Sequence, residues 1–175
     1  MTTKLKIYTV KGPSLSRRAS KSICDSFKLD IKPDDVWPVL GSSLKPWRMA
    51  VYWCGQYFNR EFGYKCGYDY APEDDESTRA FAWTDSDGRV IGACCFRQRE
   101  FTNAPRRWVL QWVWFHPLAR RKGRLARAWP YFRTVFPNFM PARPFSDAML
   151  AFLRKNDIAY LQWAAEEAKK RAKQP

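Results

Sequence analysis

The sequence predicts a single α/β domain in which helices cover a β-sheet, and three observations lead to this fold class. The chain has 175 residues, which corresponds to one domain at about 100–200 residues per domain. Its composition is 46% hydrophobic and 17% aromatic, which is enough apolar side chain to fill a core. Short runs rich in aromatic and β-branched residues alternate with longer segments of helical spacing, and no repeat or linker interrupts them.

The first 79 residues are predicted to contain one strand and one long helix. Lys4–Val10 has the pattern of a strand, and Gly12-Pro13 closes it. Asp34–Trp37 places two acids ahead of two apolar residues, which predicts a short helix. Apolar side chains recur at helical spacing over Pro46–Phe58. Gly63–Glu76 is rich in glycine, tyrosine and acid, so we expect an irregular loop there.

The middle of the chain is predicted to form three strands. Ala80–Trp83 and Arg89–Arg97 are β-like runs, and the intervening Thr84–Gly88 ends in Asp-Gly, which readily adopts the positive φ of a hairpin turn. Trp108–Phe115 has the aromatic and β-branched composition of a third strand, which Pro117 stops.

The last third of the chain is predicted to form three helices and one short strand. A helix begins near Gly123 and runs toward Phe136, and Pro130 is expected to kink it or end it early. A short strand is expected around Phe139–Phe145, and a helix over Asp147–Lys155. The spacing then predicts a C-terminal helix over Asp157–Lys173, with these side chains facing inward: Ile158, Leu161, Trp163 and Ala164.

The charge of the chain favours an anionic partner. Lys plus Arg number 31 against 17 Asp plus Glu, which gives a formal net charge of +14. Nucleic acid, a cofactor phosphate or an acidic protein face would each complement this charge. The longest apolar run, Trp108–Phe115, is far shorter than the roughly 18 residues of a membrane helix, so we expect no membrane span.

The cysteine content predicts a cytoplasmic protein. Five cysteines without a CxxC pair favour a reducing compartment. The basic segment 1–24 is similar in composition to a transit peptide, but it lacks a secretory apolar core, and the strand pattern at Lys4–Val10 argues against cleavage.

One stretch has the pattern of a pyrophosphate site. The strand that ends at His116-Pro117 is followed by a basic tract at the start of a helix: Arg120, Arg121, Lys122, Gly123, Arg124, Leu125 and Ala126. The first N–H groups of a helix have no intrahelical partner, and the helix dipole is positive there. With four cations beside these N–H groups, this helix end is suited to bind a diphosphate.

This stretch resembles motif A of the GNAT-type (Gcn5-related) N-acetyltransferases, in which a strand and a proline precede Arg/Gln-x-x-Gly-x-Gly/Ala. Arg120-x-x-Gly123 matches that motif, and the resemblance covers roughly Ala80 to Ile158. Within the family the chain is most similar to the sister-chromatid cohesion acetyltransferases, which share Trp112-Val113, the Arg-Arg-Lys tract and Phe145-Ser146-Asp147.

The resemblance implies a GNAT-like mixed, mostly antiparallel sheet flanked by helices, in one domain. Residues 1–79 would form the variable acceptor-side half, 80–158 the cofactor-binding core, and 159–175 the C-terminal helix. The cosubstrate would be acetyl-CoA, the acceptor a primary amine, and no metal would be needed. The implied cofactor-binding residues are Val113, Trp114, Phe115, Arg120, Arg121, Lys122, Gly123, Arg124, Leu125 and Ala126.

The catalytic residues are less clearly marked than the cofactor site. The resemblance favours Asp147 as the base that deprotonates the amine, with Ser146 orienting or protonating the departing thiolate. Glu100 is a rival base, and Tyr131 and Tyr160 are rival acids. A plain helix start, with Ser146 as N-cap and Asp147 as first-turn acid, explains the same two residues.

Three acceptors and one rival function stay open. A protein lysine, the amine of an aminoacyl-tRNA and a small amine are the possible acceptors. The rival is an inactive GNAT-like module that binds nucleic acid: Leu125 replaces the second small residue of motif A, and Leu153 stands where many GNAT enzymes carry tyrosine. Three alternating tryptophans, expected to share one face of a strand, are interpreted as core or cofactor-channel residues rather than base-stacking ones: Trp108, Trp112 and Trp114.

No metal site is predicted. His116 is the single histidine, and beside Pro117 it is interpreted as a structural residue. The region around Cys66 faintly resembles the zinc finger of the cohesion acetyltransferases, but the partner cysteine and both histidines are absent, so four ligands are not available. Cys94 and Cys95 are interpreted as small core residues.

Overall fold

A five-stranded mixed sheet in the order β1-β2-β3-β4-β5 organises the structure, a computed structural model that describes residues 36–39, 45–63, 76–86, 88–101 and 104–171. The predicted strand Lys4–Val10 and most of the predicted loop Gly63–Glu76 lie outside these residues. Neighbours are antiparallel from β1 to β4, and β5 is parallel to β4. The strands are β1 Val36–Val39, β2 Thr78–Thr84, β3 Val90–Phe101, β4 Ala104–Phe115 and β5 Met140–Pro141.

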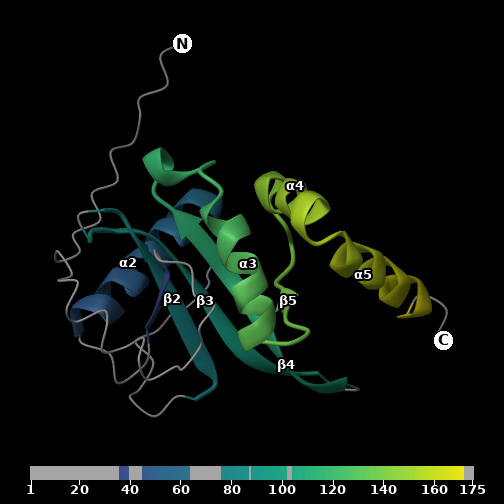
Figure 1. The fold of residues 1–175 in the computed structure, drawn as a ribbon. Helices are drawn as coiled ribbons and strands as arrows, with labels where there is room; N and C mark the ends of the chain where they lie inside the picture. The colour runs from purple at the N-terminus through teal and green to yellow at the C-terminus, as the bar shows by residue number, and fades with distance from the viewer. Residues whose placement is uncertain (1–35, 40–44, 64–75, 87, 102–103, 172–175) are drawn as a thin grey trace.

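Helices cover both faces of the sheet (Figure 1). One face carries the long helix α2, and the other carries α3, with α4 and α5 beyond it. The domain is therefore α/β with a mixed, mostly antiparallel sheet, as the sequence predicts. The helices are α2 Lys45–Phe62, the short 3₁₀ helix η1 Pro117–Ala119, α3 Arg124–Val135, α4 Asp147–Asn156 and α5 Ile158–Arg171.

The hairpin between β2 and β3 forms at the predicted place. Gly88 has φ of +78° and its N–H donates to the carbonyl oxygen of Asp85 at 3.0 Å. The Asp85 carboxylate accepts from the backbone N–H of Arg89 at 2.8 Å. The turn is thus closed locally, by the residue types that favour it.

The N-terminal end of the described chain corrects one prediction. Val36–Val39, expected as part of a short helix, is the edge strand β1, paired with β2 from Val36↔Trp83 to Val39↔Ala80. Val36 and Val39 are fully buried, so β-branched residues that complete the sheet outweigh the helix-start pattern. Pro38 is compatible with a strand here because β1 lies at the edge of the sheet.

A β-bulge in β4 corrects a second prediction. Cys95 pairs with Trp112 and Phe96 pairs with Leu110, which leaves Gln111 without an opposite residue. Because one extra residue reverses the alternation of side chains, the three tryptophans do not share a face. Trp112 and Trp114 pack under α2, whereas Trp108 packs on the α3 side, with its ring centroid 4.7 Å from that of Phe136.

Two helices also differ from expectation. Pro130 does not end α3, which continues to Val135; Pro130 itself is exposed, and buried side chains on both sides of it hold the helix on the sheet. In α5 the buried stripe is Tyr160 and Ala164, while Ile158 and Trp163 are 53% and 37% exposed.

The position of Asp157 explains why the buried face of α5 differs from the predicted one. It separates α4 from α5, and its carboxylate accepts hydrogen bonds from Trp129 Nε1 and the Arg133 guanidinium. These tertiary bonds fix where the new helix begins, so its inward face starts from Tyr160 rather than Ile158.

Candidate functional site

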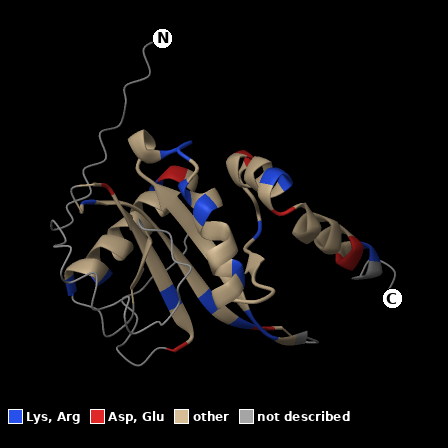
Figure 2. Ribbon diagram, in the orientation of Figure 1, with Lys and Arg blue, Asp and Glu red and all other residues tan. Residues whose placement is uncertain are grey.

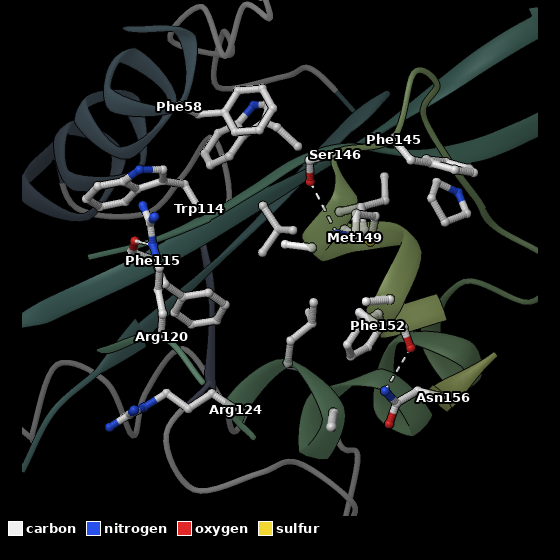
Figure 3. A pocket seen from close by; sticks show the side chains of 18 of the residues that line it. Phe58, Trp114, Phe115, Arg120, Arg124, Phe145, Ser146, Met149, Phe152 and Asn156 are labelled. Carbon is white, nitrogen blue, oxygen red and sulfur yellow. Dashed lines mark hydrogen bonds between the residues drawn. The ribbon is translucent and has the colours of Figure 1, made fainter. Parts of the chain in front are cut away.

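A pocket of about 840 Å³ lies between β4, α3 and α4. In Figure 3 Phe115, Arg120 and Arg124 lie on one side of it and Met149 and Phe152 on the other. A volume of this size is in the range of small-molecule and cofactor sites, which is about 300–1,000 Å³.

The pocket exists because β4 and β5 separate. The two strands pair only at Val109↔Met140 and Leu110↔Pro141, and the N–H of Ala142 donates to the carbonyl of Leu110 at 2.8 Å. The bulge at Gln111 follows at once, and from there no described strand pairs with this edge of β4. The strand therefore presents a polar backbone edge to the pocket.

The pocket joins the two faces of the sheet. Val113 and Phe115 pack toward α3, whereas Trp112 and Trp114 pack toward α2, and all four line the same pocket. A ligand in the gap between β4 and β5 would consequently contact the α3 side with one end and the α2 side with the other.

The α3 end has the geometry of an anion site. Gly123 is the N-cap with φ of +71° and makes no side-chain cap hydrogen bond, and the first helical bond of α3 runs from the N–H of Arg127 to the carbonyl of Gly123. Residues of the N-terminal turn of α3 line the pocket, and the helix dipole is positive at this end. Three cations line the pocket around it: Arg121, Lys122 and Arg124.

The fourth cation, Arg120, is held by the protein itself. Its Nη1 and Nη2 atoms each donate to a carboxylate oxygen of Glu61 at 2.6 Å, and its Nε donates to the Phe115 carbonyl at 2.9 Å. Trp114 Nε1 donates to the same Glu61 carboxylate at 2.9 Å. Arg120 lines the pocket, but its charge is neutralised, so it positions the turn after β4 rather than supplying a free cation for a phosphate.

Glu61 is expected to stabilise the fold in a pH-dependent way. Burial raises the pKa of Glu61, but the hydrogen bonds from Arg120 and Trp114 and the Arg120 charge outweigh burial, so the pKa lies below its ordinary value. A carboxyl with a lowered folded-state pKa contributes stability above its unfolded pKa, and this is lost as the pH falls through the folded value.

A Glu61→Gln variant is therefore expected to lose about 1–2 kcal/mol of unfolding free energy at pH 7. The deficit should shrink as the pH falls below about 4.5, as measured by urea unfolding from pH 7 to pH 3. Glu166→Gln, at an exposed position, is the control and should change stability by less than about 0.5 kcal/mol. A deficit that grows in acid would contradict the assignment.

Solved structures of other proteins share the fold of this chain. No family model and no curated protein matches the sequence. The acetyltransferase domain of xEco2, solved with a CoA conjugate, matches with a TM-score of 0.51 at 14% identity, over 70% of this chain and 88% of that chain. An aminoglycoside acetyltransferase from a soil metagenome, meta-AAC0020 with sisomicin, matches with a TM-score of 0.50 at 13% identity, over 70% and 86%.

The chain has the GNAT acetyltransferase fold. At this level of identity the likeness concerns the fold alone.

All ten residues predicted to bind cofactor line this pocket. They are Val113, Trp114, Phe115, Arg120, Arg121, Lys122, Gly123, Arg124, Leu125 and Ala126. Leu125, which replaces a small residue of motif A, is half-buried and packs against the core while it lines the pocket. Their proximity is a structural result, whereas their role in binding stays a prediction.

The predicted catalytic residues are not brought together. Ser146 lines the pocket, and its Oγ accepts from the N–H of Met149 at 3.2 Å as the N-cap of α4 (Figure 3). Asp147 is exposed in the first turn of α4 and does not line the pocket, and Glu100 is exposed near the end of β3. The positions of Ser146 and Asp147 are those of a plain helix start.

The two rival acids have structural positions. Tyr131 is buried in the core, and Tyr160 Oη donates to the Pro141 carbonyl at 3.3 Å. Burial raises the pKa of Tyr160. His116 accepts from the N–H of Leu118 and caps η1, which is the structural role expected for it.

The α2 end of the pocket contains residues that the sequence analysis missed. Phe58 and Phe62 line it from α2, and their ring centroids are 5.0 Å apart. Arg99 and Gln111 also line it, and Arg99 Nη2 donates to Gln111 Oε1 at 2.7 Å. The i,i+4 spacing of the two phenylalanines was a usable signal, but the bulge at Gln111 had none.

The described cysteines are buried in the core. Cys54 and Cys94 are fully buried, and burial raises the pKa of both thiols, so they are poor nucleophiles. Within the described residues no three His, Cys, Asp or Glu side chains gather as a metal site. None of the described helices combines the length and apolarity needed to cross a membrane.

Proposed function

We propose that the protein transfers an acetyl group from acetyl-CoA to a primary amine by direct attack, without a covalent enzyme intermediate. The observation that carries the proposal is the gap between β4 and β5, whose pocket is lined from the first turn of α3 to Phe58 and Phe62 of α2. A bound thioester would span the sheet, with its phosphates and its acyl group at opposite ends of the gap.

The α3 end suits the phosphates of CoA. Arg121, Lys122 and Arg124 surround the first turn of α3, where helix N–H groups and cations act together. The αL conformation of Gly123 lets the chain turn sharply into the helix. The charge and shape of this end therefore fit a diphosphate.

The open edge of β4 suits the thioester. Backbone N–H groups along Trp112–Phe115 would polarise the acetyl carbonyl and stabilise the oxyanion that forms when the amine attacks. Ser146 is a hydroxyl in the described lining and is our candidate for orienting or protonating the departing thiolate. Asp147 and Glu100 lie outside the lining, so we assign them no step.

The acceptor is proposed to be carried on a macromolecule. A protein lysine is suggested by the resemblance to the cohesion acetyltransferases and by the xEco2 neighbour, and an aminoacyl-tRNA by the net charge of +14. A small amine, as in the aminoglycoside acetyltransferases of the same fold, is the third class.

The test of the proposed function is thermal stabilisation by acetyl-CoA. A ligand that binds only the folded state at 100 times its Kd adds about 2.7 kcal/mol of stability, so the unfolding temperature should rise by several degrees in differential scanning fluorimetry. ATP at the same concentration controls for unspecific polyphosphate binding. No shift with acetyl-CoA, or an equal shift with ATP, would contradict the proposal, and nucleic-acid binding without the shift would favour an inactive binding module.

A further inference from the structure

The β3–β4 hairpin extends beyond the rest of the sheet. The β2–β3 ladder ends at Thr78↔Arg97, whereas β3 and β4 remain paired as far as Phe101↔Ala104. This two-stranded extension projects toward the lower right in Figure 1. Three arginines lie on this extension and a fourth, Arg97, lies at its base, and we call the four the basic ribbon (Lys and Arg are blue in Figure 2): Arg97, Arg99, Arg106 and Arg107.

The positive charges of the basic ribbon are not balanced by carboxylates in the described part of the chain. Arg99 lies directly opposite Arg107 in the ladder, an arrangement of like charges that is destabilising. Arg107 lies over the ring of Trp163 at 5.6 Å, and Arg99 donates to the neutral Gln111. No carboxylate among the described residues forms an ion pair with any of the four, although Glu100 lies in the same hairpin. Such a cluster suits an anion supplied from outside.

The basic ribbon leads into the pocket. Arg99 belongs to both, and with Gln111 it lies at the α2 end. Phe115 lies four residues after Gln111 on β4, a distance of roughly 13 Å along the strand. The ribbon therefore meets the pocket at the end away from the α3 anion site, where the proposed acceptor enters.

The pocket lining is poorly suited to a lysine acceptor. Within the described residues, its charged side chains are all cations: Arg99, Arg120, Arg121, Lys122, Arg124, Arg143 and Lys155. The described lining also has no histidine, cysteine or tyrosine. It thus offers no base to deprotonate an ammonium group and no carboxylate to attract one.

An α-amine needs neither of these. With a pKa of about 7.7–8.0, roughly a quarter of an α-amine is unprotonated at pH 7.4, against about one part in a thousand for a lysine of pKa about 10.4. The α-amine is therefore present in its nucleophilic form about 200 to 300 times more often. The neutral α-amine can attack the acetyl carbonyl without a base from the described lining: the C–N bond forms, the C–S bond breaks, and the departing CoA thiolate takes up the proton that the nitrogen loses.

We propose that the acceptor is the α-amine of an aminoacylated nucleic acid, whose phosphates bind the basic ribbon while the amine enters the pocket past Arg99. Arginine suits this role because its planar guanidinium binds phosphate through two hydrogen bonds. The proposal rests on the acetyl-transfer function proposed above, and it names the acceptor of that reaction.

The binding test uses a ribbon variant that leaves the pocket intact. Arg97→Gln/Arg106→Gln changes two ribbon residues outside the lining, and Lys45→Gln/Arg154→Gln removes the same charge at exposed positions on α2 and α4. Fluorescence anisotropy with labelled deacylated tRNA measures affinity against salt. Loss of two phosphate contacts should reduce the slope of log K against log salt by about 1.4–1.8 and weaken binding about tenfold, with a clearly smaller effect in the control.

The outcomes of this test separate the proposal from its rivals. Equal losses in both variants would mean that net charge alone binds tRNA and would overturn the ribbon assignment. Tighter binding of poly-glutamate than of tRNA, with the same dependence on the two arginines, would indicate an acidic protein partner and would also overturn it. The acetyl-CoA thermal shift should be unchanged in Arg97→Gln/Arg106→Gln, so failure of the cofactor site is seen separately.

The acceptor test measures transfer of radiolabelled acetyl groups at pH 7.4. We expect label on the amino acid of aminoacyl-tRNA and at least tenfold less on a lysine peptide with a blocked N-terminus. Transfer to aminoacyl-tRNA should fall about tenfold in kcat/KM in Arg97→Gln/Arg106→Gln and stay near wild type in the control. Label that enters the lysine peptide preferentially, or no label on the tRNA while the acetyl-CoA shift persists, would overturn the acceptor assignment.

Discussion

Replacement of Gly123 by glutamate is expected to weaken acetyl-CoA binding by at least about 100-fold and to abolish the thermal shift, because a like charge next to a bound phosphate costs several kcal/mol. An added Cβ at Gly123 would meet only Arg127 Nη1, at 3.6 Å, so there is room for a side chain. The glutamate would lie at the N-cap of α3, where its carboxylate competes with the diphosphate for the same N–H groups and cations.

The fold should survive this change. A non-glycine residue at φ of +71° costs about 1–2 kcal/mol, and a carboxylate at a helix N-terminus offsets part of this. Gly123→Asn is the matched control, since asparagine tolerates the left-handed region and adds no charge. Isothermal titration should show near-normal binding for asparagine and none for glutamate. Unchanged affinity in Gly123→Glu would show that the phosphates bind elsewhere.

Truncation of Phe132 is expected to have the largest effect on stability, about 3–5 kcal/mol of unfolding free energy for Phe132→Ala. The side chain is fully buried on α3, and its ring centroid lies 4.9 Å from that of Phe81 and 5.1 Å from that of Phe96. Its removal leaves a cavity between α3 and the sheet, and α3 is also the helix whose first turn forms the anion site.

The measurement is urea unfolding of the wild type, Phe132→Ala and the control Phe132→Leu. Leucine retains most of the buried volume and should cost less than about 1.5 kcal/mol. A loss of less than about 1.5 kcal/mol in the alanine variant too would mean that Phe132 does not hold α3 on the sheet as its burial indicates.

Local patterns account for what the sequence predicted well. The Asp-Gly turn, the proline after β4, the glycine before α3 and the serine before α4 act within a few residues of themselves. Each of these features could therefore be predicted without knowledge of the rest of the fold, as the hairpin at Gly88 and the cap at Ser146 illustrate. The ten predicted cofactor-binding residues lie in two neighbouring segments, 113–115 and 120–126, so local patterns were enough to group them.

Long-range partners account for what it missed. Glu61 and Arg120 are 59 residues apart, and no sequence pattern near either residue predicts their ion pair. The edge strand β1 depends on a register with β2 that is set more than 40 residues later. Asp157 changes the phase of α5 because Trp129 and Arg133 on α3 bind it. Each of these depends on a distant residue, and no local propensity encodes it.

The unpaired residue at Gln111 constrains how the length of β4 can change. The segments on either side of Gln111 follow opposite side-chain parity, with Leu110 directed to the α3 side and Trp112 to the α2 side. Deletion of Gln111 would move the side chains of Trp112 and Trp114 from the α2 side of the sheet to the α3 side, or would shift the basic tract that begins at Arg120. Natural variants of this strand should therefore gain or lose residues in pairs. A relative that lacks a single residue of β4 is expected to have lost the binding space between β4 and β5.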